Sequence, residues 1–207
     1  MAAARGRRGE ATADPDRIID AALALIVDRG WRNVSLAGVA GEAGLSVLQV
    51  YRLFRSRTAI LCGLLRRVDE VVLATPLELE VDERPRDRVF DLLMRRFDAL
   101  QPHRLALEAL RRDLRADPCT ALALGGALLG SIRLMLEAAG IATHGVGGTI
   151  AVKLTTAAYL AAAQTWSRDE SPDLAPTMAV LDRRLRGIER WLSPITSGRG
   201  NAAEASA

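Results

Sequence analysis

The segment from residue 43 to residue 68 combines apolar helical spacing with an excess of positive charge. It carries five arginines and contains no aspartate or glutamate. Guanidinium groups bind phosphate oxygens well, so such a segment favours a polyanionic partner. The first 70 residues hold 11 arginines and eight acidic residues, whereas the charges of the remainder cancel, so the whole formal charge of +3 lies in this third. A solvated basic surface explains the same composition, and the charge alone identifies no partner.

Enzyme and metal chemistry find little support in the sequence. The two histidines, His103 and His144, lie in no motif with a nucleophile or metal ligands. Cys62 and Cys119 are too few for a zinc site or a disulfide framework, and their apolar helical contexts predict buried thiols. The glycines of HGVGG do not follow a strand, so this segment is predicted to connect two helices and not to bind phosphate. We therefore expect a protein that is not an enzyme and needs no metal or cofactor.

Helices must position the basic residues, because apolar residues recur at helical spacing nearly everywhere and no segment alternates as a strand would. An all-α fold is predicted. The N-terminal arm (residues 1–13) and the tail (residues 194–207) are small and polar, and we expect both to be disordered. The larger helices are expected over residues 85–100, 103–115, 118–139, 146–168 and 172–193.

Three short helices precede these long ones. Asp14, followed by proline, caps a first helix that ends at Gly30. Ser35 caps a second helix, and a glycine turn leads to a third that starts at Ser46. Gln49 stands three residues after Ser46, which is the spacing of a capping box. A fourth helix, capped by a serine at position 56, runs to about residue 73.

The second and third of these helices, joined by a glycine turn, describe a helix-turn-helix whose third helix can lie in a major groove. The pattern over this region resembles the TetR family of bacterial repressors. The resemblance implies a DNA-binding domain over residues 14–62, a helical ligand-binding and dimerisation domain over residues 63–193, and double-stranded DNA as partner. The residues that carry it are Ile19, Ala22, Gly30, Ser35, Val39, Ala40, Ala43, Gly44, Ser46, Tyr51, Phe54, Ser56 and Leu61.

The third helix departs from the family pattern at Leu48 and Leu53, where the family often has a small residue and a Tyr or His. Gln49 can read an adenine edge, whereas Val47 and Leu48 can meet only thymine methyl groups. We therefore expect docking through phosphate contacts, with weak sequence preference. The predicted DNA-contacting residues are Ser35, Ser46, Val47, Leu48, Gln49, Tyr51, Arg52, Arg55 and Arg57.

A second resemblance suggests another function. Residues 86–104 and 171–191 resemble parts of the ubiquinone-biosynthesis lipid-binding proteins, which share the TetR fold but bind an isoprenoid lipid. A degenerate recognition helix suits such a role. The basic arm RGRR and the arginines of the third helix favour DNA, and the polar tail forms no amphipathic helix for a membrane surface. We prefer the DNA-binding regulator and keep the lipid-binding protein as the alternative.

The family resemblance also implies a pocket for a small apolar or amphipathic ligand, although each candidate residue alone is better explained as part of a core. The predicted lining residues are Phe90, Met94, Phe97, Leu110, Met135, Tyr159 and Trp166.

A homodimer is expected, in which the last two long helices pair with their symmetry mates in a four-helix bundle. The alternative is that the apolar stripe of the last helix packs inside its own subunit. The predicted interface residues are Ala158, Ala162, Met178, Leu181, Leu185 and Ile188. The N-terminus lacks a signal-like apolar stretch, so a cytoplasmic protein without membrane insertion is expected.

Overall fold

The computed structural model of the chain describes residues 14–75 and 83–192. Within these ranges every regular element is helical and no strand occurs, which confirms the predicted all-α fold. The predicted arm and tail lie outside the described residues. The α-helices are α1 (Pro15–Arg29), α2 (Leu36–Glu42), α3 (Val47–Leu53), α4 (Arg57–Ala74), α5 (Pro85–Leu100), α6 (Arg104–Asp113), α7 (Pro118–Ala138), α8 (Gly145–Trp166) and α9 (Ala175–Leu192).

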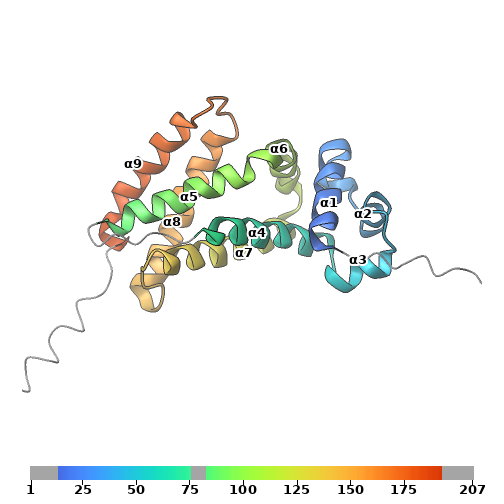
Figure 1. Cartoon of the computed structure of the whole chain (residues 1–207), viewed down its shortest axis with the longest axis horizontal. Coiled ribbons are helices and arrows are strands. Elements are labelled where there is room, and N and C mark those ends of the chain that lie inside the picture. The colour runs from blue at the N-terminus through green and yellow to red at the C-terminus, as the bar shows by residue number, and fades with distance from the viewer. Residues whose placement is uncertain (1–13, 76–82, 193–207) are drawn as a thin grey trace, which may run out of the picture.

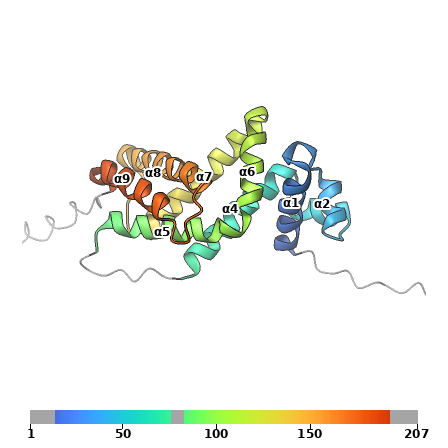
Figure 2. The ribbon, with the colours of Figure 1, turned by 90° about the horizontal axis from the view of Figure 1, so that it is seen from above.

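Helices α1 to α3 form a small unit at one end of the molecule, and α8 and α9 lie toward the other end (Figure 1). Helix α4 starts beside α1 and continues into the larger unit, where it packs along α7. Helix α6 stands between α1 and the rest of the larger unit (Figure 2) and contacts α1. The small unit is therefore held to the larger one by α4 and α6, and the predicted boundary at residue 62 falls inside α4.

Side-chain caps start the short helices where the sequence predicts them. The Asp14 carboxylate accepts a hydrogen bond from the backbone N–H of Asp16 at 3.0 Å. The Ser35 and Ser56 hydroxyls accept from backbone N–H groups three residues later, each at 3.0 Å. These bonds satisfy N–H groups that have no partner inside the helix, so the helix starts are set locally.

Helix α9 begins later than predicted, at Ala175 instead of near residue 172. Leu174 has a φ of 53°, in the left-handed region, which is incompatible with a continuing helix at that point. The preceding turn is organised by Asp169, whose carboxylate accepts from the backbone N–H and the hydroxyl of both Ser171 and Thr177, at 2.5 to 3.1 Å. One buried carboxylate thus joins the end of α8 to the first turn of α9.

The environment of Asp169 predicts a loss of stability in acid. Burial raises the pKa of this carboxyl, but the bonds from Ser171 and Thr177 together outweigh burial and lower the pKa from 3.8 to about 2. Because the folded pKa is depressed, the stabilisation is complete above about pH 4 and is lost as the pH falls toward 2. The shift corresponds to about 2 kcal/mol. Urea unfolding at several pH values should show this slope, and Asp169→Asn should flatten it while lowering stability at neutral pH.

Most of the side chains predicted to face a partner subunit are buried within the subunit itself. Leu181 and Leu185 are fully buried within their own subunit, where α9 packs on α5 and α8. Ala158 and Ala162 are also buried, so the assignment of these four residues to a dimer interface is corrected. The amphipathic stripe of α9 instead completes the core of one subunit. Of the predicted residues, Met178 is exposed and Ile188 is partly buried.

Helices α7 and α8 are long and apolar enough, by length and composition, to cross a membrane. The core helices of soluble proteins often share this property. Here both helices pack within the larger unit, α7 on α4 and α8 on α9.

Candidate nucleic-acid interface and ligand cavity

The outer face of α3 is apolar and open to solvent. Leu48 is 58% exposed and Tyr51 is 49% exposed, and Val47 and Leu53 are also exposed. Val50 and the C-cap residue Phe54 are buried and hold α3 against its neighbours. Helix α3 has only seven residues and packs on its neighbours through the side of the helix that carries Val50, so its other sides are exposed to solvent. An exposed apolar patch on a short helix indicates a contact surface.

The capping box of α3 forms as predicted, and it limits what Gln49 can recognise. The Gln49 side-chain oxygen accepts from the Ser46 backbone N–H at 2.8 Å and from the Ser46 hydroxyl at 2.9 Å. Bidentate reading of adenine needs this oxygen as an acceptor and the amide N–H as a donor. While the capping box is closed, Gln49 has only its N–H groups to offer a base edge.

The three arginines around the end of α3 have different surroundings. Arg52 and Arg55 are exposed, and neither forms an ion pair within residues 14–75 and 83–192. Arg57 donates to the backbone carbonyls of Trp31 and Val34, at 3.1 and 3.2 Å, and lies only 4.5 Å from the centre of the Trp31 ring. The assignment of Arg57 to phosphate is therefore corrected, because its guanidinium is held by the protein. Ser35 serves as the cap of α2.

Arg57 belongs to a junction between the small unit and α7. Its guanidinium pairs with Asp117 at 3.4 Å, and the same carboxylate accepts from the Trp31 indole N–H at 3.1 Å. Asp117 also caps α7 through Thr120, whose hydroxyl lies 3.2 Å from that of Thr58. The bonds from Thr120 and Trp31 lower the pKa of Asp117, so the carboxylate is charged at neutral pH. In the sequence, the position of Asp117 directly before Pro118 is typical of a helix cap.

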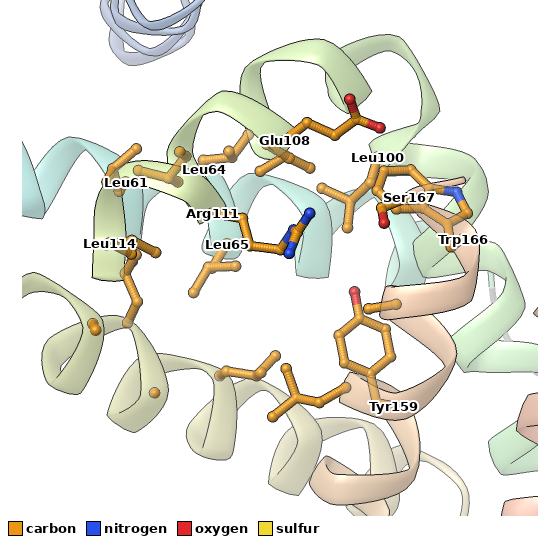
Figure 3. A pocket seen from close by; sticks show the side chains of 18 of the residues that line it. Leu61, Leu64, Leu65, Leu100, Glu108, Arg111, Leu114, Tyr159, Trp166 and Ser167 are labelled. Atoms are coloured by element: carbon orange, nitrogen blue, oxygen red, sulfur yellow. The ribbon is translucent and has the colours of Figure 1, made fainter. Parts of the chain in front are cut away.

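A cavity of about 370 Å³ lies in the larger unit and is lined by residues of α4, α5, α6, α7 and α8 (Figure 3). Leucines make up most of its wall, and Tyr159 rises from α8 with its hydroxyl directed inward. The volume is at the lower end of the range for small-molecule sites. The lining leucines are Leu61, Leu64, Leu65, Leu100, Leu107, Leu110, Leu114, Leu124, Leu128 and Leu160.

Three of the seven predicted ligand residues line this cavity, namely Leu110, Tyr159 and Trp166. Phe97 lies behind the wall, stacked on the Tyr159 ring at 4.9 Å, and Met135 is buried in the core. Phe90 and Met94 are partly buried elsewhere and do not line it. The assignment of these four residues to the lining is corrected: they support the cavity or pack away from it.

The wall residues that the sequence missed are mainly the leucines of α4 and α7. Their spacing is that of any apolar helix face, so no local signal separates a cavity wall from a packed core. Arg96 was also missed. It is fully buried, pairs with Asp69 and donates to the Ser131 hydroxyl at 2.7 Å.

Comparison with known proteins agrees with this geometry. Residues 18–62 match the family model described as bacterial regulatory proteins, tetR family. No curated protein matches the chain at a significant level.

Solved structures of TetR regulators share the fold over most of the chain. A TetR transcriptional regulator from Nitrosomonas europaea ATCC 19718 is 22% identical with a TM-score of 0.64, covering 86% of this chain and 98% of its own. A TetR transcriptional regulator from Rhodococcus sp. RHA1 is 20% identical with a TM-score of 0.59, covering 84% and 93%. A TetR regulator from Streptomyces coelicolor is 21% identical with a TM-score of 0.52, covering 87% and 96%. Residues 18–62 are thus similar to the DNA-binding domain of the tetR family of bacterial regulatory proteins, and the helices beyond them share the fold of TetR regulators.

Proposed function

We propose that the protein is a cytoplasmic, homodimeric repressor that leaves DNA when a small apolar or amphipathic molecule enters the leucine-lined cavity. The observation that carries this proposal is the position of the cavity. Its walls include α4 and α6, and these are the two helices of the larger unit that contact α1. A ligand that favours one arrangement of these helices therefore also favours one position of the helix-turn-helix.

The proposed DNA surface consists of the exposed face of α3 and the arginines that follow it. Tyr51, Arg52 and Arg55 are exposed and suited to phosphate contacts, which position the helix without reading sequence. Val47 and Leu48 offer apolar contacts to thymine methyl groups. Ser46 and Gln49 bond mainly to each other, and Ser35 is occupied as a cap, so we expect modest discrimination between sequences.

The proposed dimer surface is the outer face of α8 and α9, where a groove separates the two helices. The groove is lined by Ala161 and Gln164 on α8 and by Val180 on α9, among others. Ala157 is exposed one turn before Ala161, so small side chains continue along α8. This face replaces the buried stripe predicted from sequence, and close helix approach across it would form the two-fold bundle.

One titration tests the proposed function. The purified protein is titrated with DNA from upstream of its own gene and with a random duplex, at two salt concentrations. Tighter, salt-dependent binding to the upstream DNA, reversed by an apolar compound, is the expected result. If neither duplex binds at low ionic strength while isoprenoid lipids do, the lipid-binding alternative is correct and the repressor proposal fails.

Replacing the exposed arginines should weaken DNA binding without changing sequence preference. Arg52→Ala or Arg55→Ala removes one phosphate contact, and the slope of log affinity against log salt should fall by about one for each. Affinity for specific and random duplexes should drop by the same factor. Arg133→Ala, which removes an exposed charge from α7, is the matched control and should leave the slope unchanged. A preferential loss for one sequence would show that the arginine reads a base.

A further inference from the structure

Arg96 is the one cavity-lining charged residue that is fully buried, with 0% of its surface exposed. Its Nη1 group is satisfied by the Asp69 carboxylate and the Ser131 hydroxyl. Its Nε and Nη2 atoms are buried and have no hydrogen-bond partner among the described residues. Buried N–H groups without partners are rare and unfavourable, and more so on a charged group. Because Arg96 is among the residues that line the cavity, a bound molecule that shifts this side chain can supply the missing acceptor.

The unsatisfied atoms define the kind of acceptor. The N–H groups of Nε and Nη2 lie on the same edge of the guanidinium plane and point in parallel, while Nη1 points elsewhere. Parallel donors at this spacing match the two oxygens of a carboxylate, which binds such an edge with two charge-assisted bonds. A single hydroxyl or carbonyl oxygen would leave one of the donors without a full bond.

The other polar groups around the cavity favour an acid with a single charge. Asp69 already shares the positive charge of Arg96, so a dianion such as a phosphate monoester would be poorly balanced. Glu108 lies 3.7 Å from Arg104, and its carboxylate points away from the cavity, whereas Arg111 reaches inward from α6 (Figure 3). The Trp166 indole N–H is engaged by Gln101 at 2.8 Å.

The remaining wall is apolar. Tyr159 stands next to Arg96, whose guanidinium carbon lies 5.6 Å from the centre of the Tyr159 ring. The leucines of α4, α6 and α7 cover the rest. A molecule that fits both the Arg96 guanidinium and the leucine wall carries a polar group at one end and a hydrocarbon body of moderate size.

We propose that the ligand is an amphipathic monocarboxylate whose carboxylate binds the Nε and Nη2 edge of Arg96 and whose apolar body lies among the leucines. This inference rests on the proposed ligand function of the cavity. Binding can be measured without DNA, so its failure and the failure of the repressor proposal are distinguishable.

Calorimetric titration with decanoate, methyl decanoate and decylamine tests the proposal on the full chain. Decanoate should bind at least about tenfold more tightly than the ester, because charge-assisted bonds are lost in the ester, and decylamine should bind worst. Arg96→Lys retains a cation for Asp69 but removes the second edge. It should weaken decanoate binding by about 10- to 100-fold and change ester binding little. Leu128→Ala is the apolar control and should weaken both ligands alike.

A second measurement keeps the test valid if Arg96→Lys does not fold. The carboxyl carbon of ¹³C-labelled decanoate, bound to the unaltered protein, should titrate at a lower pH than free decanoate, because a guanidinium stabilises the ionised form. Equal affinity for acid and ester, no binding of decanoate, or loss of binding in Arg111→Gln but not in Arg96→Lys would overturn the proposal. If decanoate fails while a neutral apolar compound releases the protein from its DNA, the repressor function stands and only the carboxylate assignment falls.

Discussion

Leu181→Arg is expected to unfold the larger unit and not to release folded monomers. Leu181 is fully buried where α9 packs against α8 and α5, so the arginine would be placed in a core without a partner charge. Loss of the leucine and burial of an unpaired cation together should destabilise the fold by more than about 4 kcal/mol. Circular dichroism during urea titration should show that the variant lacks the cooperative transition expected of the unaltered protein.

Ala157→Arg provides the contrasting substitution. Ala157 is exposed on α8, so an arginine there meets no core residue and should leave the unfolding transition nearly unchanged. If the outer face of α8 and α9 joins two subunits, sedimentation should show a monomer, and DNA affinity should fall because paired helix-turn-helix units are lost. If Leu181→Arg gives a stable, folded monomer and Ala157→Arg leaves the dimer intact, the dimer interface is the apolar stripe of α9 and not the outer face of α8 and α9.

The second large effect is expected at Gly148, in the first turn of α8. A Cβ atom at this position would lie 2.3 Å from the carbonyl carbon of Thr143, and that contact is with backbone, which cannot rotate away. Gly148→Ala should therefore displace the start of α8 from the preceding loop and destabilise the protein by about 2 to 4 kcal/mol. Thermal unfolding monitored by circular dichroism at 222 nm measures this loss of stability.

Gly126→Ala should change the free energy of unfolding in the opposite direction and stabilise the protein. Gly126 lies in α7, and a Cβ there meets no atom within 4 Å among the described residues. Replacing a helical glycine with alanine in open space should stabilise the fold by about 0.5 to 1 kcal/mol. If Gly148→Ala is as well tolerated as Gly126→Ala, then α8 and the loop before it are not in close contact.

The sequence predicts the helices well because their ends depend on residues close together in the chain. Asp14, Ser35, Ser46 and Ser56 cap helices by bonding to backbone groups two or three residues away. Both partners of each of these bonds lie within a few residues of sequence, so the sequence alone is enough to predict them. The late start of α9 was missed because Leu174 adopts a positive φ, which its residue type disfavours.

The sites are harder to predict because they depend on partners far away in the chain. Arg57 looks like a phosphate ligand until Asp117, 60 residues later, is found beside it. The sequence does not distinguish Arg96 from the other arginines, because Asp69 and Ser131, which bond to it, and the cavity beside it are brought together only by the fold. For Leu181, an amphipathic stripe predicts burial, but it does not say whether the covering surface belongs to the same subunit.

The junction of Trp31, Arg57 and Asp117 limits how freely the helix-turn-helix unit of this protein can be exchanged for that of another protein of the same fold. In a domain exchange, Trp31 and Arg57 would be replaced together with the helix-turn-helix, whereas Asp117, which caps α7, would remain with the cavity. A chimera that joins this cavity to the DNA-binding domain of another protein would keep the partly buried carboxylate of Asp117 without its indole and guanidinium partners. A new DNA-binding domain introduced by domain exchange must therefore carry a tryptophan and an arginine at the positions of Trp31 and Arg57.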